Sequence, residues 1–314
     1  MPSTSMLHVD ARLSQLSFLY SNELIGRYIG QEILPLVSVR KKSDKYLIYN
    51  KQDRFTLPNN KIGRKSQAVE VDWGTTDGSY DCEGYALEEF IPDEDFESAD
   101  EVFDLMSDST NDLTDKNMAI AEKRVADLVF SSSTITTGVT LSGTSQWNDY
   151  TNSDPISDLR TAINGTFIPA NTLVLGYDVY EKLLDHPDFV ERFIRNGSLA
   201  NNASIIAEIL DVDTVLIGKA KYNSANVGAT PVYSRIWGKK ALAFYRAPRP
   251  GKRIMSLGYT FSWTAAGGAN GNFVTRRRDD ARGLTGGEVV KVVQSVDEKV
   301  TAVDVGYLIT DAVA

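Results

Sequence analysis

The charged residues of the chain are concentrated in two neighbouring blocks of opposite sign. Residues 40–65, the basic block, contain nine Lys and Arg residues against Asp44 and Asp53, which gives a net charge of +7. Residues 81–115, the acidic block, contain fourteen Asp and Glu residues and no Lys or Arg, which gives −14. Like charges at this density repel within a block, while the two blocks attract each other. Each block is either a solvated face of one molecule or a surface that meets the opposite block of another copy.

The second interpretation identifies residues that would make contact between copies. The cations belong to the basic block, and the acids lie early in the acidic block. The candidates for inter-subunit contact are Lys51, Arg54, Lys61, Arg64, Lys65, Glu88, Glu89, Asp93, Glu94 and Asp95. We therefore expect the basic block of one copy to lie over the acidic block of its neighbour, which would direct the geometry of assembly more than its affinity.

The chain lacks the side chains that most catalytic and metal sites require. Its 314 residues include two histidines, His8 and His186, and one cysteine, Cys82. An internal disulfide is therefore impossible, and a zinc site made of His and Cys is nearly excluded. The Gly-rich segments match neither a phosphate-binding loop nor a dinucleotide-binding fingerprint. We assign no catalytic, cofactor-binding or metal-binding residue, although Mg²⁺ or Ca²⁺ bound by carboxylates stays open.

The overall charge and the apolar runs limit the partners of the chain. The net charge is −9, whereas a protein that coats a polyanion is usually basic. Arg276–Arg278 and Arg282 could touch phosphates, but Asp279 and Asp280 favour local ion pairs instead. We find no signal peptide and no membrane span, and so expect a soluble protein made inside the cell, without a membrane partner.

The first third of the chain predicts an arm followed by a long β-hairpin. Residues 1–45 combine an extended pattern with one short amphipathic piece at 13–19. Strand-like residues at 35–58, and again at 69–73 and 80–87, flank a polar and basic loop. Such a pattern is typical of two paired strands joined by a long connection.

The strongest helical pattern covers residues 98–130. Ser98 and Glu101 have the spacing of a capping box, and acidic residues crowd the beginning, where the helix dipole favours them. Ser107–Thr110 could interrupt the pattern. The segment is therefore either one long helix or a short helix followed by a longer one.

The remainder alternates between helical and strand patterns, which is typical of an α+β or α/β domain. Asp154 and Pro155 have the residue types of an N-cap and a first helical position. Helices are predicted at 155–165, 177–185, 188–195 and 205–210, and strands at 172–175, 214–217, 241–245, 255–263, 289–293 and 300–309. Two classes of function remain: a structural protein that assembles, and an α/β enzyme or ligand-binding domain whose site no motif marks.

Residues 169–194 read PANTLVLGYDVYEKLLDHPDFVERFI, a predicted strand leading into a helix that contains a His-Pro pair. This segment resembles part of the major capsid proteins of tailed bacteriophages. Residues 209–225, 236–248 and 304–313 resemble later strands of that family, and 43–55, 71–95 and 122–130 resemble earlier segments. The matches follow the family's order over residues 35–313.

The resemblance implies the Hong Kong 97-type capsid fold, an α+β fold with parts that can be placed on this chain. They are an N-terminal arm at 1–45, an extended E-loop hairpin at 46–92, a peripheral (P) domain with its spine helix at 93–133, an axial (A) domain at 134–250, long P-domain strands at 251–287 and C-terminal strands returning to the core at 288–314.

The resemblance also implies partners. Copies of the chain would form pentamers and hexamers, and these would close into the icosahedral shell of a virion. Assembly would take place in the host cytoplasm. The shell would enclose double-stranded DNA without sequence-specific binding. A scaffold protein, a portal and a decoration protein are implied partners, and no cofactor is implied. An encapsulin-like protein compartment with the same fold is the alternative.

Overall fold

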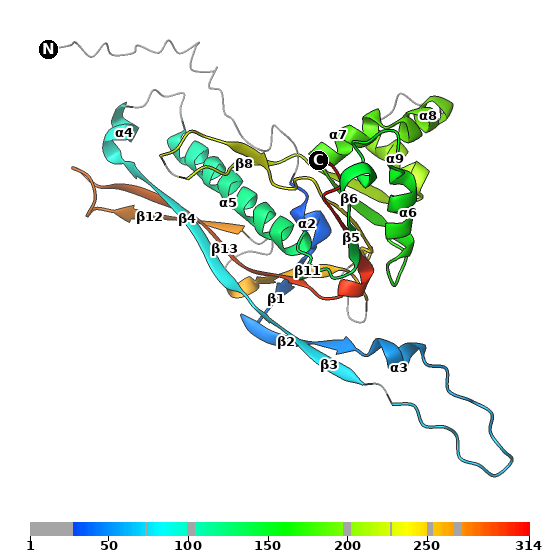
Figure 1. The fold of residues 1–314 in the computed structure, drawn as a ribbon. Coiled ribbons are helices and arrows are strands. Elements are labelled where there is room, and N and C mark those ends of the chain that lie inside the picture. The colour runs from blue at the N-terminus through cyan, green and yellow to red at the C-terminus, as the bar shows by residue number, and fades with distance from the viewer. Residues whose placement is uncertain are drawn as a thin grey trace.

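The main parts of the described fold are two five-stranded sheets, one long helix and one projecting hairpin (Figure 1). The computed structural model describes residues 28–72, 74–98, 104–196, 202–226, 228–249, 254–266 and 272–314. Most of the predicted arm, including the amphipathic piece at 13–19 and His8, lies outside the described residues. The described end of that arm forms α2 (Gly30–Ile33) and β1 (Leu36–Val39).

The first sheet is organised around its longest strand, β13 (Gly287–Val300). Strand β4 (Glu83–Pro92) pairs with one side of β13, while β12 (Asn272–Asp279) and β11 (Gly258–Trp263) share the other side. These three pairings are antiparallel, and β1 extends the sheet by pairing parallel with β11. The chain thus brings its first described strand beside strands that lie more than 200 residues later.

Three strand predictions in this region need correction. The apolar runs at 289–293 and 300–309 predict two strands, but one strand continues through Val300 and a separate strand, β14, covers Gly306–Thr310. The strand predicted at 255–263 begins at Gly258. The sequence does not predict strand β12, because most of its side chains are exposed and its sequence has no apolar alternation. Its strand conformation comes from pairing with β13.

The long helix α5 (Leu105–Val129) lies across the first sheet (Figure 1). Asp104 caps it by accepting a hydrogen bond from the Ser107 backbone N–H at 3.1 Å. The predicted start at Ser98 is wrong, since Ser98 ends the separate helix α4 (Asp93–Ser98), and its partner Glu101 lies outside the described residues. Of the two alternatives, the structure has a short helix followed by a longer one, but Ser107–Thr110 do not separate them, because these residues lie inside α5.

The second sheet has the strand order β5-β14-β10-β6-β7 and is covered by four helices. Its strands are β5 (Gly138–Thr140), β6 (Thr172–Gly176), β7 (Thr214–Gly218), β10 (Ala241–Phe244) and β14. The helices are α6 (Pro155–Asn164), α7 (Tyr177–Asp185), α8 (Pro187–Asn196) and α9 (Asn202–Leu210). This arrangement confirms the predicted helices and strands of the region to within a few residues, including the Asp154 cap and Pro155 at the first position of α6.

The hairpin projects from the two sheets (Figure 1). It consists of β2 (Ser43–Tyr49) paired antiparallel with β3 (Thr75–Asp81), and the short helix α3 (Lys51–Phe55) follows β2. The hairpin prediction is therefore confirmed, but the strand expected at 69–73 is not, because the pairing with β2 begins at Thr75. A smaller hairpin is made by β8 (Lys221–Asn223) and β9 (Tyr233–Arg235).

Candidate assembly surfaces

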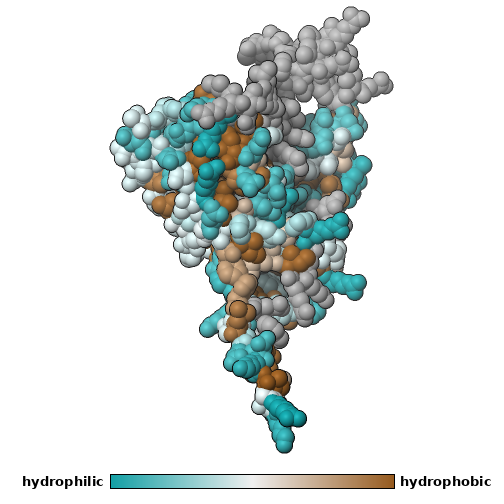
Figure 2. Space-filling model, turned by 90° about the vertical axis from the view of Figure 1, so that its right-hand side faces the viewer, coloured by the Kyte–Doolittle hydropathy of each residue, from teal (hydrophilic) through white to brown (hydrophobic). Residues whose placement is uncertain are grey.

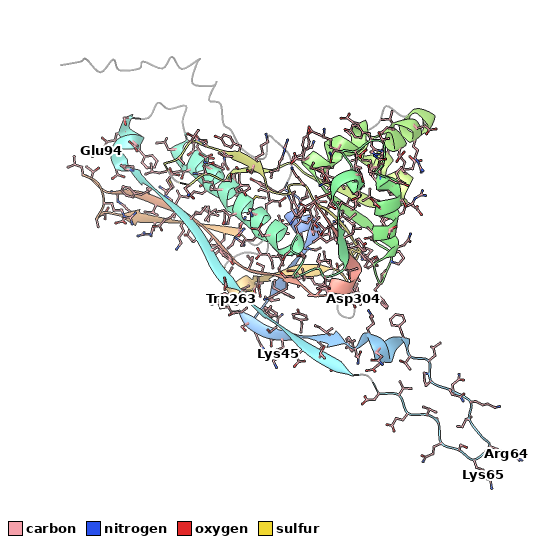
Figure 3. The ribbon with its side chains drawn as sticks, in the orientation of Figure 1. Lys45, Arg64, Lys65, Glu94, Trp263 and Asp304 are labelled. Atoms are coloured by element: carbon pink, nitrogen blue, oxygen red, sulfur yellow. The ribbon has the colours of Figure 1, made fainter. Side chains whose placement is uncertain are left out.

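The connection between β2 and β3 carries both cations and exposed apolar side chains. Lys61, Arg64 and Lys65 are exposed, and Figure 3 places Arg64 and Lys65 at the far end of the projecting loop. Leu57 is 92% exposed and Ile62 is more than half exposed. In Figure 2 the projecting loop, at the bottom of the view, carries both hydrophobic and hydrophilic residues. Exposed apolar side chains on an extension of this kind are suited to burial against another molecule.

The root of the hairpin is anchored in an aromatic cluster on the first sheet. Phe261 of β11 stacks on Tyr80 with ring centroids 4.6 Å apart and on Tyr46 at 5.7 Å. Cys82 is buried beside them, and its burial raises the pKa of the thiol to about 11, so the thiol is not a reactive nucleophile. The backbone N–H of Asp81 also donates to the carboxylate of Asp297 at 2.8 Å.

Helix α3 makes a second contact between the hairpin and the rest of the chain. The ammonium group of Lys51 lies 2.7 Å from a carboxylate oxygen of Asp304 and 4.3 Å from the centre of the Phe167 ring. The ring of Phe55 meets Phe167 edge-on at 5.0 Å. Lys51, predicted to contact a neighbouring copy, therefore has partners in its own chain, while the Arg54 side chain lies outside what the structure describes.

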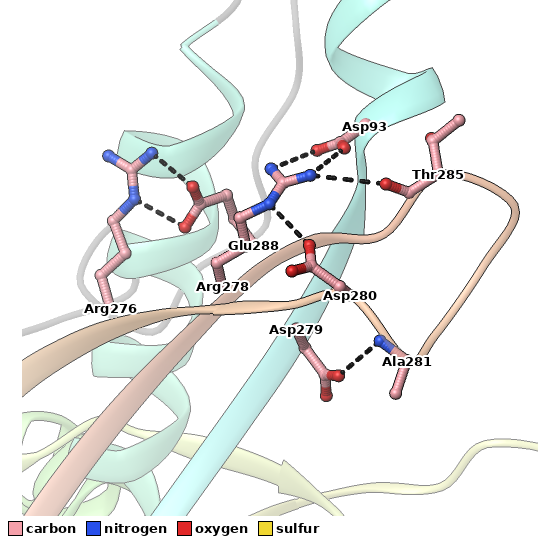
Figure 4. A network of polar contacts seen from close by, with 8 residues as sticks. All are labelled: Asp93, Arg276, Arg278, Asp279, Asp280, Ala281, Thr285 and Glu288. Carbon is pink, nitrogen blue, oxygen red and sulfur yellow. Dashed lines mark hydrogen bonds and ion pairs between the residues drawn. The ribbon is translucent and has the colours of Figure 1, made fainter.

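Part of the acidic block is neutralised within the chain by the arginines of β12 and the turn after it. Glu88 lies 3.9 Å from Arg277 and 4.0 Å from Arg282. Asp93 accepts two hydrogen bonds from Arg278, whose guanidinium also binds Asp280 and the Thr285 carbonyl (Figure 4). These contacts confirm the expectation of local ion pairing for the arginine cluster.

The remaining candidates divide into one that makes a half-buried contact within the chain and two that lie on an exposed helix. Glu89 accepts a hydrogen bond from the Ser109 hydroxyl at 2.6 Å, which joins β4 to α5. Glu94 and Asp95 are exposed on α4. In Figure 3, Glu94 lies at the opposite end of the molecule from Arg64 and Lys65. The tip of the basic block and α4 therefore do not meet within one copy, and a contact between copies stays a prediction.

A buried junction, which the sequence does not predict, joins the long helix to α2 and to the segment before β10. Glu122 of α5 accepts hydrogen bonds from the backbone N–H groups of Ile29 and Gly30 and from the indole of Trp237. Burial raises the pKa of Glu122, and the three donors act in the opposite direction. A lone Glu on a helix gives no sequence signal for this role, since its three partners come from elements about 90 or more residues away.

No group of three or more His, Cys, Asp and Glu side chains within the described ranges is placed to hold a metal ion. None of the helices that the structure describes is both long and apolar enough to cross a membrane. An open groove runs along α6 and is lined by Asp154, Ser157, Arg160, Thr161, Asn164 and Arg192.

Comparison with known proteins decides the family. No family model matches the chain. The major capsid protein of Pseudomonas phage JBD67 is 32% identical over 320 aligned residues, which cover 99% of this chain and 99% of the relative. The chain belongs to the family of phage major capsid proteins. The family resemblance expected from the sequence is thereby confirmed.

Solved structures show that this major capsid protein has the Hong Kong 97-type fold. A phage-related protein from Bordetella bronchiseptica aligns with a TM-score of 0.69 and 22% identity, covering 97% of both chains. The capsid protein of cyanophage P-SCSP1u aligns with a TM-score of 0.61 and 13% identity, covering 94% of this chain and 90% of that one. The α+β fold class expected from the resemblance is confirmed, and the relatives of the chain are structural proteins of virion capsids.

Proposed function

We propose that the chain assembles through pentamers and hexamers into an icosahedral shell that encloses the double-stranded DNA of a phage. The observation that carries this proposal is the identity with a phage major capsid protein along the whole length of both chains. The projecting hairpin supports it, because its exposed apolar side chains suit burial on a neighbouring copy. Many modest contacts per subunit would then add up, since each additional contact within a shell is effectively intramolecular.

The parts of the chain are assigned accordingly. The N-terminal arm is 1–45, and the E-loop hairpin is 46–92, although its last strand β4 pairs with β13 rather than within the hairpin. The P domain comprises 93–133 and 251–287, and the A domain comprises 134–250. The C-terminal segment 288–314 returns to both sheets through β13 and β14.

The shell holds its DNA by confinement rather than by a basic lining, which agrees with a net charge of −9. Assembly takes place in the host cytoplasm with a scaffold protein, a portal and, in the finished virion, a decoration protein. The chain acts as a building block and not as an enzyme.

Negative-stain electron microscopy of the expressed protein tests the proposal. Uniform closed shells or rings of five and six subunits are expected. Dispersed monomers at concentrations where related capsid proteins assemble would contradict it. An encapsulin-like compartment is the weaker alternative, and it is separated from a phage shell by the neighbouring genes: portal and terminase genes belong to a phage, whereas a cargo enzyme gene belongs to a compartment.

A further inference from the structure

Two contacts between the hairpin and the rest of its own chain differ in character. The first is its root, where Tyr80 and Phe261 stack and are 7% and 8% exposed. The second is α3, where Phe55 meets Phe167 and Lys51 meets Asp304. Phe55 remains 67% exposed in this second contact. Solvent-exposed contacts break more readily than buried ones, so the contact at α3 is the easier of the two to break.

The surface that receives α3 is held in place by the body of the chain. The backbone N–H of Phe167 donates to the carbonyl of Asp304 at 2.9 Å, so the ring and the carboxylate are adjacent before α3 reaches them. These two residues lie 137 positions apart in the sequence, in the segment after α6 and in the turn before β14. A receiving site with fixed geometry can hold α3 in one position.

Helix α3 is in turn fixed to the hairpin. The backbone N–H of Asn50 donates to the Gly74 carbonyl at 2.9 Å, and the N–H of Gly74 donates to the Asp53 carboxylate at 3.0 Å. The side chain of Asn50 caps α3 by accepting from the Gln52 N–H. A movement of α3 is therefore a movement of the outer end of the β2–β3 hairpin.

We propose that α3 is a releasable latch. It holds the hairpin at one angle against its own subunit through Phe55 on Phe167 and Lys51 on Asp304. Its release lets the hairpin turn about the Phe261 cluster when copies of the chain pack together. The second part rests on the proposed function, since it requires copies that pack in a shell.

The chain allows a direct measurement of the hairpin angle. Thr76 of β3 and Ser157 of α6 are exposed and can be replaced by cysteines that carry spin labels. The native Cys82 is buried with a raised thiol pKa, so it does not compete for the label. Pulsed electron spin resonance on unassembled subunits then reports the distance between the two labels.

The unassembled protein is expected to show one narrow distance distribution. In the double variant Phe167→Ala, Asp304→Asn, a second population is expected to rise about two- to tenfold relative to the latched one, the range that the loss of an aromatic pair gives. The exchange Lys51→Asp with Asp304→Lys, made in a chain that keeps Phe167, preserves the aromatic contact and reverses the ion pair, so it should keep the narrow distribution. Tyr233→Ala removes an exposed aromatic ring elsewhere, and Asp77→Asn removes an ion pair inside the hairpin; both should leave the distribution unchanged.

Identical distributions in the native protein and in the Phe167→Ala, Asp304→Asn variant would overturn the latch. Labelled subunits that are assembled into shells with an excess of unlabelled subunits test the release. The distance between the two labels is expected to differ from that in the free subunit. Shells that form with the distance of the free subunit would overturn the release but leave the proposed function intact. Failure of the native protein to form shells would overturn the proposed function, and the measurement on free subunits would still decide whether the latch exists.

Discussion

The carboxylate of Glu122 lies 2.6 Å from the indole nitrogen of Trp237, and this bond joins the long helix α5 to the segment that leads into the second sheet. The same carboxylate accepts the backbone N–H groups of Ile29 and Gly30 at 3.0 and 2.6 Å. One buried side chain thus holds three parts of the fold that are far apart in the sequence.

Replacing this carboxylate by an amide is expected to destabilise the subunit. Glu122→Gln leaves one acceptor oxygen for three donors and turns an NH₂ group toward at least one buried N–H group. The free energy of unfolding should fall by about 1–3 kcal/mol, the cost of leaving buried donors without acceptors. Denaturant unfolding of unassembled subunits measures this, with the exposed Glu181→Gln on α7 as the matched control. Equal stabilities of the two variants would contradict the role of Glu122.

The close packing around Trp237 leads to a second prediction, on a glycine of the neighbouring strand. A Cβ atom at Gly218 in β7 would overlap the indole ring of Trp237, which is itself fully buried. Gly218→Ala should therefore reduce the free energy of unfolding by about 1–3 kcal/mol through overpacking. A Cβ at Gly84 in β4 meets no atom within 4 Å, so Gly84→Ala should change stability by less than about 0.5 kcal/mol. Thermal or denaturant unfolding of the two variants side by side tests the contrast, and an equal loss in both would refute it.

Local sequence signals account for the elements around the second sheet but not for the contacts that join distant elements. The boundaries of α6 follow from the Asp154 cap, Pro155 and Gly165, all of which act within a few residues. Strand β3 carries a polar sequence and becomes a strand because it pairs with β2. The partners of Lys51 and Glu122 lie too far along the chain for any periodicity to indicate them.

The charge blocks give a prediction on assembly that the fold makes more specific. Glu88 and Asp93 have arginine partners in their own chain and Glu89 binds Ser109. Of the candidate acids, this leaves Glu94 and Asp95 of α4 for a neighbour. Changing Lys61, Arg64 and Lys65 to Glu should then lower the yield of shells by roughly tenfold or more at low salt, because like charges would face each other across the contact. The melting temperature of the free subunit should not change, since all three side chains are exposed.

The control for this prediction keeps the charge. Lys61→Arg, Arg64→Lys and Lys65→Arg together should assemble like the native protein. Adding Glu94→Lys and Asp95→Lys to the reversed hairpin should recover part of the yield. Electron microscopy and sedimentation measure the yield of shells for each variant. A normal yield from the reversed hairpin at low salt would show that the basic block makes no charge contact between copies.

His186 makes the stability of the region around α7 and α8 depend on pH. It is almost fully buried, its Nδ1 accepts from the Asp188 backbone N–H at 3.3 Å, and its Nε2 therefore carries the proton and lies 3.1 Å from the Ser153 hydroxyl. Burial lowers the pKa of His186 below its usual 6.5, while the nearby carboxylates of Asp188 and Asp154 act in the opposite direction. The folded state thus favours the neutral imidazole.

The sign of the effect follows from this lowered pKa. Between the folded pKa and 6.5 the unfolded chain binds more protons than the folded one, so the free energy of unfolding rises with pH. The contribution is complete above about pH 6.5 and is lost as the pH falls through the folded pKa of His186. Denaturant unfolding from pH 5 to pH 8 should show this slope in the native protein and in His8→Gln, and the slope should be reduced in His186→Gln. An unchanged slope in His186→Gln would mean that other groups, and not this imidazole, set the pH dependence.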